Sequence, residues 1–385
     1  MTPHPPHPVH AANQSLFGGE LPMPTPTPTA ALHDLGTSLW LDNITRTLLD
    51  DGTLARYIRD LSVTGLTSNP TIFNLAVKNS AAYDATIADQ ARRGHTPEEI
   101  FFTLALEDLT RAADLFRPTH DRTGGLDGWV SLEVSPRLAY DTASTLSAAR
   151  DLHARAARPN LFIKIPGTGA GLAAIEEATA AGVPVNVTLL FTAAQYLAAA
   201  EAWMRGVERR ITAGLDPRVC SVASLFISRW DAATARRLPT HLANRLGIAI
   251  GADAYAAYRR LLAGDRWQRL ANFGVPPQRL LMASTGTKDP TLSDHLYVRE
   301  LAAPLTVNTM PEATLLAFAD HGTLGPPLPA DGGDRGRVLA AITAAGIDVA
   351  ALGTELQSQG AAAFVTSWDE LLAVITAKAQ QAGNA

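Results

Sequence analysis

A lysine in an apolar segment is the most reactive feature of the sequence. Residues 161–165 (LFIKI) are apolar on both faces except at Lys164, a pattern typical of a strand in a parallel sheet that helices cover. Burial disfavours the ammonium form of a lysine, and a free amine can attack a carbonyl carbon to form a Schiff base. In the alternative interpretation, the lysine stem reaches to the strand end, where the amine pairs with a carboxylate.

Polar side chains follow the ends of several other apolar segments. In a barrel of alternating strands and helices the active site lies at the C-terminal ends of the strands, so these side chains would meet Lys164 at one mouth. Asp42 could instead cap a helix and Glu133 could pair with Arg137. Several separate coincidences would be needed to explain the whole set in that way, so the pattern favours an active site. The set comprises Asp42, Thr67, Ser68, Asn69, Glu133, Asn186, Thr188, Ser224 and Arg229.

These residue types suit the cleavage of a carbon–carbon bond in a sugar phosphate. A protonated imine on Lys164 can accept the electron pair that remains when the bond next to a ketone breaks. Dehydration of the carbinolamine and transfer of a hydroxyl proton need separate acid–base groups, which Glu133 and Asp42 can supply. The planar guanidinium of Arg229 suits a phosphate group, because it can donate two parallel hydrogen bonds.

Short apolar segments alternate with longer amphipathic segments from Gly36 onward. Residues 97–116 and 141–157 carry Ala, Leu, Glu and Arg at helical spacing, and Thr96 with Pro97 predicts a capped helix start. Eight strand–helix units predict an α/β fold, the (β/α)8 TIM barrel, with a doubly wound open sheet as the alternative. The predicted strands are residues 38–41, 62–66, 128–134, 160–165, 185–191, 220–227, 280–284 and 305–308.

The chain is expected to form one barrel domain, residues 31–385, after a leader of residues 1–30. The leader is rich in proline, which favours extended and solvated chain, so we predict that it is disordered. Residues 322–336 are rich in Gly and Pro and predict a loop. A helical tail follows over about residues 337–381, and Gly360 and Trp368 indicate that it is broken into two or three pieces.

Composition excludes several classes of partner. The formal net charge of −5 gives no basic footprint, so neither nucleic acid nor an anionic membrane is an expected partner. No apolar run reaches the roughly 18 residues of a membrane helix, and the N-terminus lacks a signal-peptide pattern, so a cytoplasmic location is expected. The single cysteine, Cys220, lies in an apolar segment and is expected to be an inert, buried thiol.

No cofactor and no metal site are expected. Residues 167–171 (GTGAG) follow a predicted strand, but a dinucleotide fingerprint has the spacing GxGxxG, and the next strand ends without an acidic residue. His4, His7 and His10 lie three residues apart in the leader, with no second shell to orient them. No other cluster has the spacing of metal ligands.

Five motifs, taken in order, resemble the successive signatures of the transaldolases. The resemblance covers about residues 36–320 and is closest to the longer bacterial form, which is similar to this chain at 284–290 (STGTKDP) and 306–315 (TVNTMPEATL). It implies transfer of a dihydroxyacetone unit from sedoheptulose 7-phosphate to glyceraldehyde 3-phosphate, in the non-oxidative pentose phosphate pathway. The five motifs are GLTSNPTIF (65–73), SLEVSPRLAYDT (131–142), LFIKIPGTGAGLAAI (161–175), PVNVTLLFT (184–192) and SLFISR (224–229).

The resemblance also implies roles for individual residues. Lys164 would form the Schiff base, Asp42 would be an acid–base residue, and Glu133 would act through a water that Thr188 holds. Several transaldolases have a second phosphate-binding arginine beyond the seventh strand, whereas this chain offers Lys288 as a substitute. The remaining candidates are Asn69 and Asn186 for the dihydroxyacetone hydroxyls, Ser224 and Arg229 for the phosphate, and Thr67, Ser68 and Phe226 as further substrate contacts.

A fructose 6-phosphate aldolase, which shares the fold and the lysine but releases free dihydroxyacetone, is the nearest alternative. That relative typically has Gln at the position of Glu133 and Tyr at the position of Phe226, and this chain has the transaldolase residue at both. A non-catalytic barrel that binds sugar phosphates is a further alternative. Binding alone, however, gives no reason to bury an amine beside two acids.

Overall fold

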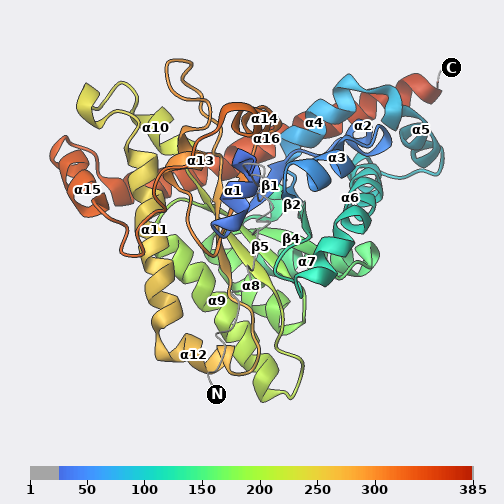
Figure 1. Cartoon of the computed structure of the whole chain (residues 1–385). Coiled ribbons are helices and arrows are strands. Elements are labelled where there is room, and N and C mark those ends of the chain that lie inside the picture. Colours follow the sequence, from blue (N-terminus) through green and yellow to red (C-terminus); the bar gives the residue numbers. More distant parts are fainter. Residues whose placement is uncertain (1–25, 384–385) are drawn as a thin grey trace, which may run out of the picture.

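Eight parallel strands close into a barrel in the order β1-β2-β3-β4-β5-β6-β7-β8 in the computed structural model, which describes residues 26–383 (Figure 1). The order is sequential, so the TIM-barrel prediction is confirmed and the open sheet is excluded. Each predicted strand is present, with ends that agree to within two residues. The strands are β1 Thr37–Asp42, β2 Val63–Thr67, β3 Trp129–Glu133, β4 Leu161–Pro166, β5 Val185–Leu190, β6 Ser221–Phe226, β7 Arg279–Ala283 and β8 Thr306–Met310.

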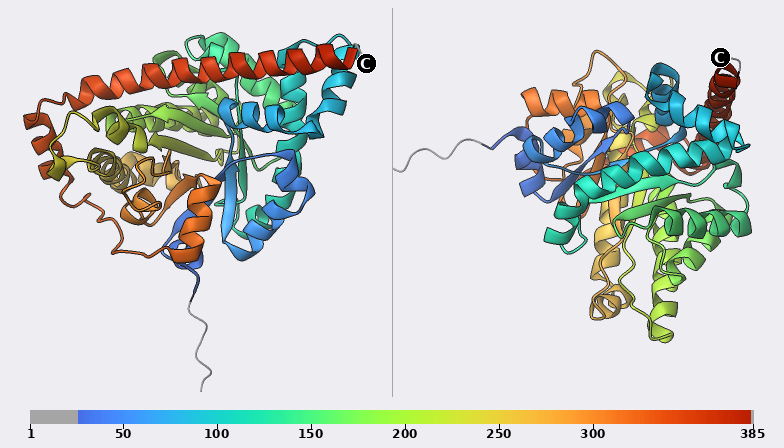
Figure 2. Two further views of the ribbon diagram at one scale, coloured as in Figure 1. Left: turned by 90° about the horizontal axis from the view of Figure 1, so that it is seen from above. Right: turned by 90° about the vertical axis from the view of Figure 1, so that its right-hand side faces the viewer.

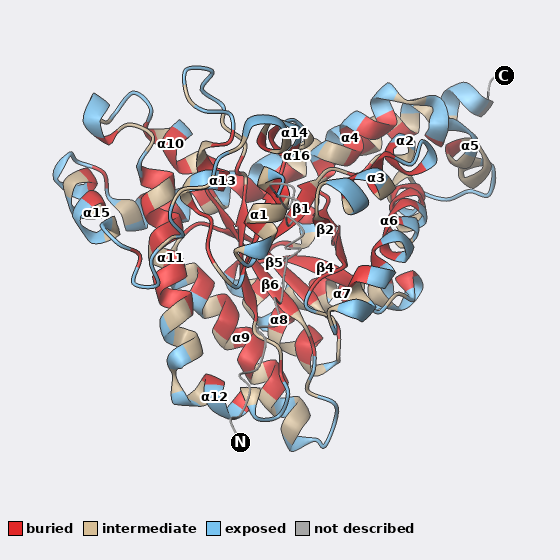
Figure 3. Ribbon diagram, in the orientation of Figure 1, coloured by how far each residue is buried: buried red, intermediate tan, exposed pale blue. Residues whose placement is uncertain are grey.

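Helices connect the strands and cover the outside of the barrel. Their buried faces point inward and their exposed faces outward, as the amphipathic spacing predicts (Figure 3). The helices are α1 Pro28–Asp34, α2 Arg46–Asp50, α3 Thr53–Asp60, α4 Pro70–Asn79, α5 Asp84–Arg92, α6 Pro97–Arg122, α7 Thr142–Ala156, α8 Gly169–Ala180, α9 Ala193–Thr212, α10 Ser228–Thr234, α11 Leu246–Ala263, α12 Asp265–Ala271, α13 Leu296–Glu300, α14 Glu312–His321, α15 Arg335–Ala344 and α16 Val349–Gly383.

The predicted start of α6 is confirmed in detail. Thr96 Oγ1 accepts a hydrogen bond from Glu99 N at 3.3 Å, and the Glu99 carboxylate accepts one from Thr96 N at 2.7 Å, which is a capping box. Pro97 occupies the first helical position. The helix continues past residue 116, where the prediction ended it, and includes Pro118.

Large aromatic side chains fill the barrel beneath the C-terminal ends of the strands. The ring of Phe162 stacks on Trp129 with centroids 4.0 Å apart and on Trp40 at 6.2 Å. Gly65 makes room for them, because a Cβ there would lie 2.7 Å from both the Trp40 ring and the Trp129 carbonyl oxygen. The interior is therefore a packed core, and only the mouth is free to hold a ligand.

The C-terminal tail differs from the prediction. The chain breaks between α15 and α16, where Gly346 has φ of 90°, and not at Gly360 or Trp368, which lie inside the continuous helix α16. A Cβ at Gly360 would lie 3.0 Å from Leu189 and 3.2 Å from Arg229, so this glycine permits close packing. Figure 2 shows α16 crossing the width of the molecule from α15 to α5.

Helix α16 is also the one helix within residues 26–383 that is long and apolar enough to cross a membrane. The sequence had predicted no such segment. The apolar residues of α16 contribute to packing within the molecule, because the helix packs on α4, α5 and α6. Trp368, Leu371 and Ile375 are buried there, and the Trp368 ring lies 4.8 Å from that of Phe101.

The N-terminal boundary lies earlier than predicted. Helix α1 begins at Pro28, Thr27 caps it through a 3.3 Å bond from Ala30 N, and Thr29 is fully buried. The predicted boundary at residue 31 therefore falls inside α1, while most of the predicted leader, with His4, His7 and His10, lies outside the described residues.

Two further predictions concern residues between the N-terminal and C-terminal segments. Residues 322–334 connect α14 to α15 without a helix, which agrees with the predicted loop. Cys220 was predicted to be buried, but the structure shows it half-buried. The burial that it has raises the pKa of its thiol to about 11. A thiol with so high a pKa is a poor nucleophile, as expected for an inert cysteine.

Candidate active site

The strand register brings the predicted chemical groups to one level of the barrel mouth. Glu133 on β3 pairs with Lys164 on β4, and Lys164 pairs with Asn186 on β5. On the two strands that precede β3 around the barrel, Asp42 on β1 pairs with Thr67 on β2. These residues are at or near the C-terminal ends of their strands, where active sites of this fold lie.

Lys164 is buried and points to the centre of the mouth. Its Nζ donates hydrogen bonds to the carbonyl oxygen of Ser68 at 3.0 Å and to Glu133 Oε2 at 3.3 Å. The side chains of Lys164 and Glu133 are only 6% and 5% exposed. Lys164 thus pairs with a carboxylate, as the alternative interpretation of this lysine predicted. The pair, however, lies inside the barrel and not in solvent.

Burial raises the pKa of both carboxyl groups near Lys164. Burial raises the pKa of Asp42, while the Lys164 charge and a 2.7 Å hydrogen bond from Thr67 Oγ1 partly oppose the shift. Burial also raises the pKa of Glu133, against the opposing effect of Lys164, and the Asp42 charge adds to the rise. Carboxyl groups held in this way can accept and return protons, which is what general acid–base catalysis needs.

Two buried oxygen atoms beside Lys164 have no hydrogen-bond partner within residues 26–383. They are Glu133 Oε1 and Thr188 Oγ1. Buried polar atoms in proteins are almost always hydrogen-bonded, so each orphaned atom needs an explanation. A small polar molecule, such as a water or a substrate hydroxyl, could satisfy both.

A cavity of about 260 Å³ opens at this mouth. Most of the predicted residues line it, and so do several residues that were not predicted, including Ser284, Thr309 and Phe364. Phe364 comes from α16, which therefore roofs part of the cavity. The predicted residues that line the cavity are Asp42, Thr67, Asn69, Lys164, Thr188, Ser224, Phe226, Arg229 and Lys288.

Three predicted residues lie behind the cavity wall. The Ser68 hydroxyl donates to the carbonyl oxygen of Ser131 at 2.8 Å. The amide of Asn186 donates to Ser131 Oγ at 3.0 Å and accepts from Ser224 Oγ at 2.7 Å. Glu133, with Ser68, borders a much smaller adjoining pocket and contacts the cavity through Lys164.

Asn69 caps a helix and also lines the cavity. Its Oδ1 accepts a hydrogen bond from Ile72 N at 3.1 Å and caps α4. The same bond orients the side chain, and its amide NH2 group has no bond within the described chain. Since Asn69 lines the cavity, that group is placed to donate to a substrate oxygen.

Arg229 is a half-buried cation without a counter-ion. No carboxylate of residues 26–383 lies within ion-pair distance of it, and burial lowers the pKa of its guanidinium. The guanidinium carbon lies 5.1 Å from the ring of Phe226 and 5.9 Å from that of Phe364, which hold the side chain by cation–π contacts. An anionic substrate group would supply the missing charge, and Lys288 stands exposed at the rim of the same cavity.

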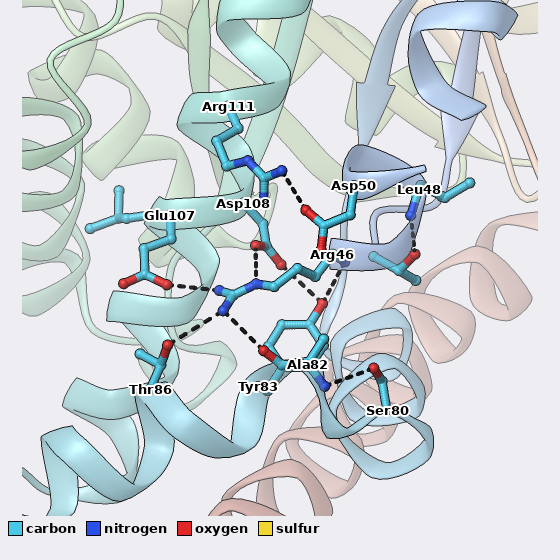
Figure 4. Close-up of polar contacts among 12 residues, drawn as sticks. Arg46, Leu48, Asp50, Ser80, Ala82, Tyr83, Thr86, Glu107, Asp108 and Arg111 are labelled. Carbon is cyan, nitrogen blue, oxygen red and sulfur yellow. Dashed lines mark hydrogen bonds and ion pairs between the residues drawn. The ribbon is translucent and has the colours of Figure 1, made fainter. Parts of the chain in front are cut away.

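A buried ion pair fixes the segment that follows Asp42. Arg46 Nε donates to Asp108 Oδ1 at 2.9 Å, and Tyr83 OH donates to Asp108 Oδ2 at 2.9 Å while accepting from Arg46 N at 2.8 Å (Figure 4). Asp108 is fully buried on α6. This network ties the start of α2 to α6, so the chain beyond Asp42 is held in one position.

Residues 167–171 lead from β4 into α8. Thr168 Oγ1 caps α8 by accepting from Gly171 N at 3.0 Å, and Gly171 packs directly against the carbonyl oxygen of Pro166. A Cβ at Gly167 would likewise meet the side chain of Leu190, so these two glycines permit close packing, whereas a Cβ at Gly169 would meet nothing within 4 Å. The one group in the described part of the chain that could ligate a metal ion, formed by Asp294, His295 and His321, lies outside this cavity.

Sequence reasoning could not have found Phe364. It lies in a tail whose other apolar residues pack on the barrel, and nothing in the local pattern distinguishes it from them. Its position depends on how α16 docks. Gln357 anchors that helix by donating to the carbonyl oxygens of Gly167 at 3.1 Å and Leu189 at 2.9 Å.

Comparison with known proteins finds transaldolases, in agreement with the resemblance of the sequence motifs. Residues 39–375 match the family model described as Transaldolase/Fructose-6-phosphate aldolase. A transaldolase of Arthrobacter sp. (strain FB24) is 45% identical over 358 residues, covering 90% of this chain and 96% of the relative. Transaldolase 1 of Streptomyces coelicolor is 44% identical, covering 90% and 93%. A transaldolase of Saccharopolyspora erythraea is 44% identical, covering 94% of this chain and 100% of the relative.

Proposed function

Because the chain belongs to the transaldolase/fructose-6-phosphate aldolase family and is an enzyme that transfers a dihydroxyacetone unit, we propose that it works through a Schiff base on Lys164. The observation that carries this proposal is a buried amine near two carboxyl groups, buried Glu133 and half-buried Asp42, whose pKa values are both raised. Of the four lysines, Lys78, Lys164, Lys288 and Lys378, Lys164 alone is buried.

The first step joins donor and enzyme. Lys164 Nζ attacks the ketone carbon of the donor sugar, and the carbinolamine loses water to give the imine. Glu133 lies 3.3 Å from Nζ, so it can move the protons of this step. Its orphaned oxygen and that of Thr188 support a water molecule between them as the carrier.

The second step breaks the carbon–carbon bond. Asp42 takes the proton of the neighbouring hydroxyl, the aldehyde product leaves, and the imine accepts the electron pair of the broken bond. Asp42 lines the cavity, and its hydrogen bond from Thr67 orients it. The three-carbon unit stays on Lys164 until an acceptor aldehyde takes it by the reverse of these steps. Arg229 would hold the phosphate, with Ser224 and Lys288 near it, while Asn69 would bind donor hydroxyls.

Fructose 6-phosphate aldolase activity is the second candidate, since the matching family includes it. The residues at positions 133 and 226, Glu and Phe, support transaldolase instead. We further propose that the enzyme transfers the dihydroxyacetone unit from sedoheptulose 7-phosphate to glyceraldehyde 3-phosphate, which gives erythrose 4-phosphate and fructose 6-phosphate, in the pentose phosphate pathway and in the cytoplasm.

Borohydride trapping tests the proposal. The enzyme is incubated with fructose 6-phosphate, reduced with borohydride, digested and mapped by mass spectrometry. We expect the adduct on the peptide that contains Lys164 and none on those with the exposed Lys78 or Lys288. Lys164→Arg should fold normally and lose turnover, because a guanidinium cannot form a productive imine. Adduct on another lysine, or full turnover by Lys164→Arg, would refute the Schiff-base assignment.

A further inference from the structure

Three metal-ligand side chains meet outside the substrate cavity. Asp294 Oδ1 lies 3.0 Å from His295 Nδ1 and 3.2 Å from His321 Nε2, and the donor atoms of the three residues all lie within 4.8 Å of one another. Zn–N bonds of about 2.0–2.1 Å in a tetrahedral site place neighbouring ligand atoms about 3.3 Å apart. The two short separations are close to this value, so one ion could join the three residues with little movement.

Neighbouring groups orient both histidines. His321 Nδ1 lies 3.1 Å from Asp320 Oδ2, which favours a proton on Nδ1 and leaves the lone pair of Nε2 directed at Asp294. A carboxylate behind a histidine is the usual outer partner of a metal-binding imidazole. The His295 side chain is only 8% exposed, and its ring packs edge-on against Phe318 with centroids 5.6 Å apart.

The donor set determines which ion would bind. Two imidazoles and one carboxylate suit Zn²⁺ and related transition metals, whereas Mg²⁺ and Ca²⁺ prefer oxygen ligands. An open cleft of about 420 Å³, lined also by Thr287 and Asp289, leaves room for a water at the fourth position. The alternative explanation of the short distances is a doubly protonated His321 held between Asp294 and Asp320.

We propose that Asp294, His295 and His321 bind one zinc ion per chain. The ion would join residues 284–295, which follow β7, to the end of α14, which follows β8. Residues 284–295 include Lys288 at the rim of the substrate cavity, so the ion would hold this part of the rim in place. The proposal does not depend on the reaction proposed above.

Zinc titration of the full-length chain tests the site. The three leader histidines are first replaced (His4→Ala, His7→Ala and His10→Ala), so that they cannot contribute, and Zn²⁺ is titrated in competition with a chromophoric chelator. We expect one ion per chain and no displacement by excess Mg²⁺. Asp320→Ala should weaken binding by about 10- to 100-fold, because it removes the outer partner of His321.

His321→Ala should weaken binding at least as much, since it removes a ligand. The matched control is His33→Ala, which alters another exposed histidine beside an aspartate and should leave affinity unchanged. Zinc should also slow hydrogen exchange over residues 284–295 in the parent and not in His321→Ala. If the parent binds no zinc at micromolar concentrations, or if His321→Ala binds as tightly as the parent, the group is an ion-pair network and the proposal is wrong.

Discussion

Removal of the Arg229 charge should separate phosphate recognition from chemistry. The half-buried guanidinium has no carboxylate partner among the residues that the structure describes, so we expect the substrate phosphate to act as its counter-ion. Arg229→Met keeps an apolar stem against the rings of Phe226 and Phe364 but deletes the charge and all donors. The expected result is a large loss of kcat/KM for phosphorylated donors and little change for donors without phosphate.

The size of the loss follows from the hydrogen bonds removed. A hydrogen bond to a charged group contributes about 1.5–3 kcal/mol, and a guanidinium can make two of them to one phosphate. Ser224 and Lys288 remain at the same end of the cavity, so we expect a net loss of about 3 kcal/mol, which is roughly 150-fold in kcat/KM. Arg229→Lys should lose less, because it keeps a point charge.

The assay compares two donors, fructose 6-phosphate and fructose, with erythrose 4-phosphate as acceptor, and measures glyceraldehyde 3-phosphate, or glyceraldehyde, by a coupled reaction. The ratio of the two kcat/KM values should fall about 150-fold in Arg229→Met and less in Lys288→Met, whose side chain is exposed at the rim. The melting temperature should change little. The variant loses the cation–π contacts, but it also removes the half-buried guanidinium charge, whose desolvation costs free energy in the folded state. An unchanged donor ratio, with both activities reduced equally, would show that Arg229 does not bind the phosphate.

Four further predictions concern the carboxylates and the N-terminus. Glu133→Gln should slow formation of the reducible imine by about 10²- to 10⁴-fold, because an amide cannot carry the proton, and early borohydride trapping measures this rate. Asp42→Asn should form the imine but stall cleavage, so the trapped adduct keeps the whole donor sugar; a three-carbon adduct formed at the wild-type rate would contradict this division of roles. Burial raises the pKa of Asp42, so its stabilising effect is greatest below the ordinary pKa and is lost as pH rises through the raised pKa. Asp42→Asn should therefore melt higher than wild type at neutral pH, and this advantage should vanish in acid. A chain that starts at Pro26 should keep the melting temperature and kcat of the full chain. A chain that starts at Ala31 should melt at a lower temperature, because it loses the cap of α1 and buried Thr29. Equal melting temperatures of the two truncated chains would contradict this prediction.

Most of the barrel could be predicted from the sequence because its strands are buried on both faces. Such strands appear as short apolar runs, and the polar residues that follow them mark the mouth, which is how Lys164, Asp42 and Glu133 were found together. The helix start at Thr96 was equally clear, since a capping box depends on residues three positions apart.

What the sequence could not predict depends on tertiary docking. Gly360 has the local pattern of a helix end, but contacts with Leu189 and Arg229 require a residue without a side chain inside a continuous helix. His295 and His321 belong to the consecutive units of β7 and β8, and they meet only when these two strands pair in the folded barrel. No local spacing encodes either arrangement.

The position of α16 has a consequence for how the enzyme is made. All residues that line the cavity, apart from Phe364, are in place by Pro311, so the barrel and its lysine can be translated before the last helix exists. The roof, however, is the final segment of the described chain, and Gln357 and Phe364 can dock only after it has left the ribosome. During synthesis the nascent chain would therefore pass through a stage in which the reactive amine is present under an open mouth. Docking of α16, and not closure of the barrel, would then be the step that covers this part of the mouth.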